Sequence, residues 1–195
     1  MSEKYSKNLT IMDAGNNIFN SRTETLVNTV NCVGIMGKGL AKEFKKHFPE
    51  MYEEYRIRCE NNEIKPGQPY IWKNKPGGKS VLNFPTKQHW KGNSRLEWIE
   101  YGLKFFSDNY HNWGIVSIAF PALGCTNGGL DWESVEPMML RHLQKLSDIT
   151  IEIYPPSIKH ALIKKNTLKN KRQKKGPRPE KSLSGFTTAD KLRSD

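Results

Sequence analysis

The sequence predicts an α/β protein whose core is a mostly parallel or mixed sheet covered by helices. Two observations indicate this class. Short apolar runs alternate along the chain with segments of helical periodicity, as in proteins that pack helices against a sheet. The run GIVSIAF at residues 114–120 is almost continuously apolar, which is typical of a central strand covered on both faces.

The elements of the first half follow from local patterns and from one proline. The apolar runs LTIM and TLVNTV predict strands at residues 9–12 and 25–30. Residues 39–48 and 50–60 have helical periodicity. Because Pro49 stands between them, they are expected to form two helices.

Strands and helices also alternate in the second half. Ser94 and Glu97 have the spacing of a capping box, which predicts that a helix begins there, and its apolar stripe continues to Phe106. Pro155 and Pro156 end the predicted fold. The remaining elements are expected, in chain order, as strands at 69–72 and 80–84, the strand at 114–120, a helix at 134–146 and a strand at 149–154.

Length and charge predict one domain, residues 1–154, followed by a tail. A chain of 195 residues suits a single compact domain. Residues 155–195 contain 12 basic and 3 acidic residues, so +9 of the net charge of +11 lies there. Because this segment is poor in large apolar residues, it is predicted to be disordered. It either solubilises or localises the protein, or it is an arm that contacts nucleic-acid phosphates.

The cysteine and histidine patterns exclude a disulfide framework and a zinc site. Cys32, Cys59 and Cys125 are odd in number and far apart, and the five histidines show no ligand spacing. No signal peptide or long apolar span is visible. The sequence therefore predicts a reduced, cytoplasmic protein that needs no metal or cofactor and does not contact a membrane.

Two glycine-rich segments follow predicted strands. In the first, Gly34, Gly37 and Gly39 precede a helix, so backbone N–H groups and the helix N-terminus favour an anion. It does not fit the P-loop, which needs Ser or Thr after Gly-Lys, because Gly39 follows Lys38. It does not fit the Rossmann fingerprint G-x-G-x-x-G either, because the glycine spacings stand here in the reverse order. It is either a phosphate loop of another kind or a tight turn.

The second glycine-rich segment, residues 121–132, follows the predicted central strand. Loops at the carboxyl ends of strands in one sheet can face each other across a crevice, which is where open sheets bind nucleotides. The two segments together suit a pyrophosphate held by backbone donors. No acidic cluster suited to Mg²⁺ accompanies them, which argues against phosphoryl transfer.

Three segments carry a family resemblance. They are LVNTVNCVGIMGKGLAKEFKKHFPE (residues 26–50), VLNFPTKQHW (81–90) and IAFPALGCTNGGLDW (118–132). They resemble the macrodomain family, and more narrowly its DarG-type branch of antitoxins, which remove ADP-ribose from thymidine in DNA. The resemblance covers roughly residues 9–154. It implies a three-layer α/β/α macrodomain with a central mixed sheet and ADP-ribose in a cleft at one end.

The resemblance assigns roles to residues by position. Lys87 matches the catalytic lysine of this branch, and Asn31 matches the asparagine placed near the distal ribose. Asn17 and Ile18 match the segment that contacts adenine. The loops that match those around the diphosphate and distal ribose add Gly34, Ile35, Met36, Gly37 and Gly39 from the first segment and Gly124, Cys125, Asn127, Gly128, Gly129 and Leu130 from the second. Thr86 and His89, beside Lys87, are weaker candidates.

Several roles stay open at this point. A lysine fixed at a strand end in a partly desolvated cleft is expected to have a lowered pKa. Lys87 either donates a proton to the leaving thymine or attacks an opened ribose aldehyde and forms a Schiff base. Asn31 either bonds sugar hydroxyls or caps the next turn. His89 either orients the base or packs beside Trp90.

The leading hypothesis is an enzyme that hydrolyses the N-glycosidic bond between ADP-ribose and thymidine in single-stranded DNA. The alternatives are a non-catalytic ADP-ribose-binding module and a hydrolase of protein-linked or O-acetyl ADP-ribose. Relatives in the DarG-type branch usually carry a second folded domain that helps to restrain a DarT-type toxin. Here only residues 155–195 follow the last predicted strand, so a toxin partner is left open.

Overall fold

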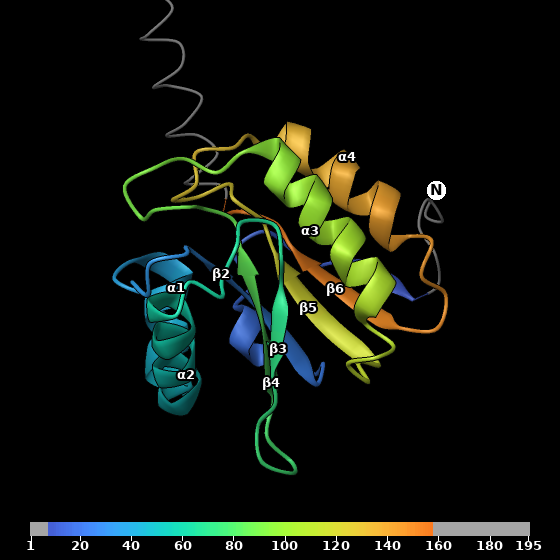
Figure 1. Cartoon of the computed structure of the whole chain (residues 1–195). Helices are drawn as coiled ribbons and strands as arrows, with labels where there is room; N and C mark the ends of the chain where they lie inside the picture. Colours follow the sequence, from blue (N-terminus) through green and yellow to red (C-terminus); the bar gives the residue numbers. More distant parts are fainter. Residues whose placement is uncertain (1–7, 158–195) are drawn as a thin grey trace, which may run out of the picture. The chain divides into compact units, whose positions relative to one another are not determined.

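Six strands form one sheet in the order β1-β6-β5-β2-β4-β3 in the computed structural model, which describes residues 8–157 (Figure 1). All neighbouring strands are parallel except β3, which runs antiparallel to β4. The predicted mixed sheet is therefore confirmed. The bounds are β1 Leu9–Ile11, β2 Thr25–Val30, β3 Tyr70–Trp72, β4 Ser80–Pro85, β5 Ser117–Pro121 and β6 Thr150–Tyr154.

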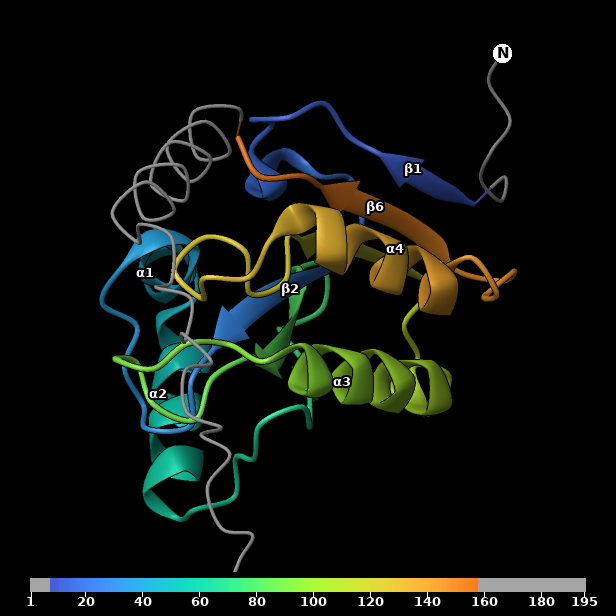
Figure 2. The same ribbon diagram turned by 90° about the horizontal axis from the view of Figure 1, so that it is seen from above.

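Helices cover both faces of this sheet. α1 and α2 lie on one face, and α3 and α4 lie on the other (Figure 2). A short 3-10 helix, η1, lies between β1 and β2 and was not expected from the sequence. The bounds are η1 Ile18–Asn20, α1 Gly39–His47, α2 Pro49–Glu60, α3 Leu96–Asn109 and α4 Trp132–Leu143.

Alternate residues of the central strand β5 contribute to two separate cores. Ile118 and Phe120 pack in the core under α3 and α4, whereas Ala119 packs in the core under α1 and α2. A strand covered on both faces has to be apolar at nearly every position. The prediction of a central strand at residues 114–120 is confirmed, although the strand begins only at Ser117.

Helix α3 begins without the predicted capping box. Its N-cap residue is Arg95, and no side chain bonds the first turn. The Ser94 hydroxyl is buried and has no hydrogen-bond partner, while the Ser94 N–H donates to the Gly128 carbonyl at 2.9 Å. The capping-box prediction is wrong because the contact with a loop distant in sequence, and not the helix end, fixes Ser94.

The predicted tail, residues 155–195, lies almost entirely outside the described residues, so its disorder and its contact with nucleic acid stay predictions. Within residues 8–157, no helix combines the length and apolar character needed to cross a membrane. The same residues contain no cluster of three or more His, Cys, Asp or Glu side chains that could hold a metal ion. Cys32, Cys59 and Cys125 are buried thiols.

Candidate active site

Three loops leave the sheet at the same edge. β2 lies between β4 and β5 and is parallel to both, so the loops that follow them, residues 31–38, 86–95 and 122–131, emerge side by side. They border a cavity of about 550 Å³, and a second cavity of about 670 Å³ adjoins it. Gly37 of the first loop and Asn127 of the third loop line both cavities, so the two form one cleft.

Asn31 holds the first loop in shape. Its Oδ1 accepts hydrogen bonds from the N–H groups of Val33 and Ile35 at 3.0 and 3.4 Å, and its Nδ2 donates to the Ile35 carbonyl at 2.6 Å. The Tyr55 hydroxyl of α2 donates to the Asn31 carbonyl at 2.8 Å. Of the two roles left open for Asn31, the structure shows these turn-capping hydrogen bonds, and the residue also lies in the wall of the first cavity.

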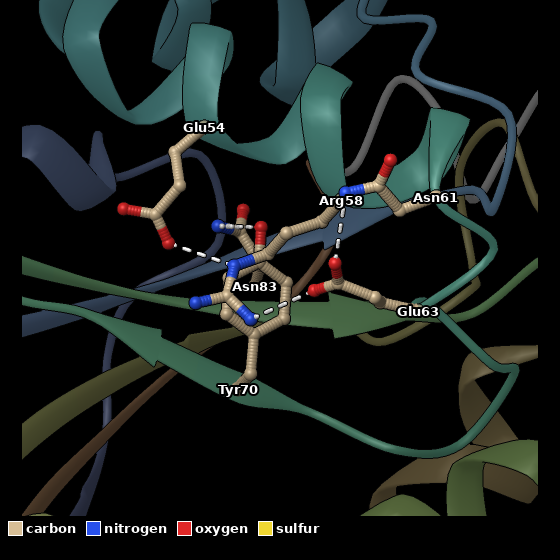
Figure 3. Close-up of polar contacts among 6 residues, drawn as sticks. All are labelled: Glu54, Arg58, Asn61, Glu63, Tyr70 and Asn83. Atoms are coloured by element: carbon tan, nitrogen blue, oxygen red, sulfur yellow. Dashed lines mark hydrogen bonds and ion pairs between the residues drawn. The ribbon is translucent and has the colours of Figure 1, made fainter.

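A polar network lies behind the first loop. The Asn28 Nδ2 of β2 donates to Asn83 Oδ1 of β4 at 3.0 Å, and Asn83 Nδ2 donates to the Tyr70 hydroxyl at 3.1 Å. Arg58 of α2 lies over the Tyr70 ring, 4.8 Å from its centroid (Figure 3). Since Asn28 Nδ2 also lies 3.8 Å from Met36 Sδ, the network supports the buried side of the first loop.

Glycines allow the third loop to approach its neighbours closely. A Cβ atom on Gly128 would lie 2.3 Å from both the Gly124 carbonyl oxygen and the Ser94 hydroxyl. A Cβ atom on Gly39 would lie 2.4 Å from Asn127 Nδ2, so the start of α1 and the third loop nearly touch. Larger residues would push these segments apart and change the width of the cleft.

Lys87 lies where the three loops meet. The Thr86 N–H donates to the Val30 carbonyl at 2.9 Å, which continues the pairing of β4 with β2 up to the lysine. Lys87 is half-buried, lines the first cavity, and donates from Nζ to the Asn127 carbonyl of the third loop. Burial lowers the pKa of the Lys87 ammonium, as expected for an amine in a cleft.

The second cavity lies beside η1 and the end of β6. Its lining includes Asn17, Ile18, Tyr154 and Pro155. Asn17 Oδ1 accepts a hydrogen bond from the Phe19 N–H at 3.1 Å and thereby caps η1. The segment expected to contact adenine therefore forms a wall of this cavity, with the Asn17 carboxamide oxygen engaged in the cap.

Positive charge dominates both cavities. Lys38, Lys87 and Lys91 line the first, and Lys38 and Lys42 line the second. Among the described residues that line either cavity there is no aspartate or glutamate. Such a lining favours an anionic ligand, because each lysine lowers the free energy of a nearby negative charge and no carboxylate opposes it.

The structure brings most of the predicted site residues to this cleft. Six positions do not line it. Gly34 packs against α2, Met36 and Cys125 are buried in the cores, and the exposed His89 ring lies 5.5 Å from the Trp90 ring. Gly129 and Leu130 are the others. The residues that do line a cavity are Asn17, Ile18, Asn31, Ile35, Gly37, Gly39, Thr86, Lys87, Gly124, Asn127 and Gly128.

Sequence reasoning missed other residues of the lining, among them Lys38, Trp90, Lys91 and Thr126. Trp90 is the last residue of the motif that contains Lys87, and Lys91 directly follows it, so their nearness to Lys87 was the available signal. The exposure of Trp90 could not be predicted from the pattern, because tryptophan side chains are highly buried on average.

A comparison with known families identifies the architecture. The family described as Macro domain matches residues 27–139. The chain belongs to the macrodomain family. Over 137 residues this macrodomain is 45% identical to a protein of Mycobacterium tuberculosis (strain ATCC 25618 / H37Rv) named DNA ADP-ribosyl glycohydrolase, a match that covers 69% of this chain and 39% of that protein. A protein of Thermus aquaticus with the same name is 39% identical over 142 residues, again with 39% of its length covered.

Solved structures agree with this assignment. The macrodomain of Mycobacterium tuberculosis DarG matches with a TM-score of 0.71 and 42% identity, over 76% of this chain and 99% of that one. Thermosipho africanus DarTG in complex with ADP-ribose matches with a TM-score of 0.73 and 39% identity, over 80% of this chain and 46% of that one. The predicted three-layer α/β/α macrodomain is confirmed. The chain spans well under half the length of the curated relatives it matches.

Proposed function

We propose that this macrodomain is a DNA ADP-ribosyl glycohydrolase that hydrolyses the N-glycosidic bond between ADP-ribose and thymidine in single-stranded DNA. The observation that carries the proposal is the position of Lys87, a half-buried amine with a lowered pKa inside the cavity that the glycine-rich loops enclose. The names of the relatives from Mycobacterium tuberculosis and Thermus aquaticus support DNA-linked ADP-ribose as the substrate class.

The cleft suits the three parts of ADP-ribose. The adenosine fits the second cavity, against Ile18 and the end of β6. The diphosphate fits between the first and third loops, where glycine backbone N–H groups and Lys38 offset its charge. The distal ribose then lies in the first cavity beside Asn31 and Lys87.

Lys87 acts in this proposal as a nucleophile. Its neutral Nζ bonds to the anomeric carbon of the distal ribose as the bond to thymine breaks, and thymine leaves with the electron pair and takes up one proton. Ring opening gives a Schiff base, and water then cleaves it to ADP-ribose and free amine. Burial favours this role because it raises the fraction of neutral amine. Proton donation to thymine is the competing role.

The modification to be reversed would come from a DNA ADP-ribosyl transferase. A relative from Thermosipho africanus, 42% identical over 170 residues, is named as a fusion of such a transferase with a DNA ADP-ribosyl glycohydrolase. This supports a DarT-type toxin as the functional counterpart of the chain, whether or not the two proteins bind each other.

A panel of linkages tests the proposal. The wild-type protein is incubated with a thymidine-linked ADP-ribosyl oligonucleotide, an ADP-ribosylated peptide and O-acetyl ADP-ribose, and released ADP-ribose is quantified. The proposal expects the largest kcat/KM on the oligonucleotide. Binding of ADP-ribose without turnover on any member of the panel would instead identify a non-catalytic binding module, and preference for the peptide or the acetyl ester would identify a different hydrolase.

A further inference from the structure

A tryptophan is exposed at the mouth of the cavity that holds Lys87. Trp90 lines this cavity, yet 47% of its surface is accessible to solvent, and it belongs to neither core. Within residues 8–157, the other large aromatic residue with comparable exposure is Tyr101 of α3, which does not line either cavity. A single exposed apolar side chain is ordinary on a protein surface, but an indole that borders a cavity offers apolar area that a bound ligand would bury.

The loop around Trp90 is held in a defined turn. The Gly92 N–H donates to the His89 carbonyl at 3.0 Å, and the Lys91 N–H donates to His89 Nδ1 at 3.3 Å. The His89 ring lies 5.5 Å from the Trp90 ring at an interplanar angle of 31°, and Lys91 Nζ lies 5.1 Å from the Trp90 centroid. The indole is thus supported by its neighbours while part of its surface remains open.

The first loop adds apolar surface next to this ring. Val33 and Ile35 are 40% and 45% exposed, and Ile35 lines the same cavity as Trp90. The Cys32 N–H donates to the Gln88 carbonyl at 3.2 Å, so the two loops run side by side. The mouth therefore combines a flat aromatic ring and aliphatic side chains with the positive charge of nearby lysines.

This combination fits a nucleobase on a single strand. Proteins bind single-stranded nucleic acid by stacking bases on aromatic rings inside a positively charged groove, because every base has a π-face and every nucleotide a phosphate. The absence of aspartate and glutamate from the described lining removes the repulsion that such a strand would meet. An ADP-ribosylated protein would present no obligatory planar group to the indole.

We infer that Trp90 is the stacking platform for the thymine from which ADP-ribose is released, and that Lys91 contacts a phosphate of the same strand. This inference depends on the proposed function and adds the reason for its preference for DNA. Lys87 and Trp90 line one cavity, so a base attached to a ribose at Lys87 has the indole within the same cavity to stack on. Stacking then fixes the leaving base relative to the amine.

Three variants test the inference against a thymidine-linked ADP-ribosyl oligonucleotide. Trp90→Ala removes the ring, Trp90→Phe keeps a smaller π-face, and Tyr101→Ala is the matched control, because it removes an equally exposed aromatic ring away from the cleft. We expect Trp90→Ala to lower kcat/KM about tenfold or more, Trp90→Phe to recover most of this loss, and Tyr101→Ala to resemble wild type.

A second substrate and a binding assay complete the test. Affinity for free ADP-ribose, measured by calorimetry, should fall far less than kcat/KM in Trp90→Ala, because ADP-ribose carries no thymine. An equal loss for ADP-ribose, an equal loss on an ADP-ribosylated peptide, or no loss at all would overturn the inference. If wild type releases nothing from the oligonucleotide, the proposed function is wrong. The inference is then tested by itself through the affinity for the labelled oligonucleotide, measured by fluorescence anisotropy: weaker binding by Trp90→Ala than by wild type supports stacking, and equal binding overturns it.

Discussion

The hydroxyl of Tyr55 lies 2.8 Å from the backbone carbonyl oxygen of Asn31 and 3.1 Å from its side-chain Oδ1. Tyr55 belongs to α2 and is fully buried, whereas Asn31 is the first residue of the loop that follows β2. Burial raises the pKa of the Tyr55 phenol, so the hydroxyl remains a neutral donor across the physiological pH range. Helix α2 thereby fixes the residue that holds the first loop of the cleft in shape.

Tyr55→Phe should weaken ADP-ribose binding as well as stability. Loss of the hydroxyl removes a buried hydrogen bond, which costs about 1 kcal/mol of unfolding free energy, and it frees the first loop to shift. The matched control is Tyr110→Phe, which removes the hydroxyl that bonds Asp148 at 2.6 Å, outside the residues that line the cleft. Denaturant unfolding should show a loss for both variants, and calorimetry should show weaker ADP-ribose binding for Tyr55→Phe alone.

Gly128→Ala should distort the third loop. The added methyl group would lie 2.3 Å from the Gly124 carbonyl oxygen and from the Ser94 hydroxyl, so the loop has to move, at a cost of roughly 1–3 kcal/mol. ADP-ribose affinity should fall several-fold. Gly92→Ala is the control, because the nearest atom to its Cβ is 3.5 Å away. Equal ADP-ribose affinities for the two variants would argue against a role of the third loop in binding.

Gly102→Ala should destabilise the protein even though alanine is the better helix former. In an exposed helix this change would stabilise by about 1 kcal/mol. Here the Cβ would lie 2.3 Å from Phe84 Cζ of β4, and overpacking of a core costs roughly 1–3 kcal/mol. Gly102→Ala is expected to lower the denaturation midpoint. Adding Phe84→Leu to the same protein should recover part of the lost stability, because the smaller side chain makes room for the new methyl group. A higher midpoint for Gly102→Ala would contradict the packing of α3 on β4.

The pH dependence of kcat/KM should report the Lys87 amine. Burial lowers its pKa from the ordinary value of 10.5, so the neutral, nucleophilic form becomes more abundant as pH rises and makes up half of the amine at a pH below 10.5. The rate should therefore rise with pH and then level off. Borohydride added during turnover should attach ADP-ribose covalently to wild type but not to Lys87→Arg. A rate that falls over this range, with no trapped adduct, would assign Lys87 the proton-donor role instead.

Much of the fold could be predicted because its signals are local. The apolar run that contains Ile118 and Phe120 marks a strand covered on both faces, and Pro49 separates α1 from α2 as expected. Lys87 could be singled out only because its motif, VLNFPTKQHW, resembles that of the DarG-type branch, and its place after the strand that Pro85 ends agrees with that assignment. The glycine spacing around Gly37 likewise marked a loop before a helix without reference to any distant contact.

The rest depends on contacts between residues far apart in sequence. The pattern around Ser94 is that of a capping box, yet the carbonyl of Gly128 binds its N–H and the helix begins later. The hydrogen bond from Tyr55 to Asn31 joins a helix to a loop that precedes it. The exposure of Trp90 depends on how the three loops are arranged around the cleft, and no periodic pattern of the sequence predicts that arrangement.

The most direct test of the central claim is release of ADP-ribose from a thymidine-linked oligonucleotide by wild type and Lys87→Ala, with ADP-ribose affinity measured for both. We expect the variant to bind ADP-ribose and to lose at least about 100-fold in kcat, because the reactive amine is gone while the loops are intact. Equal release by the two proteins would show that the amine of Lys87 takes no part in breaking the bond.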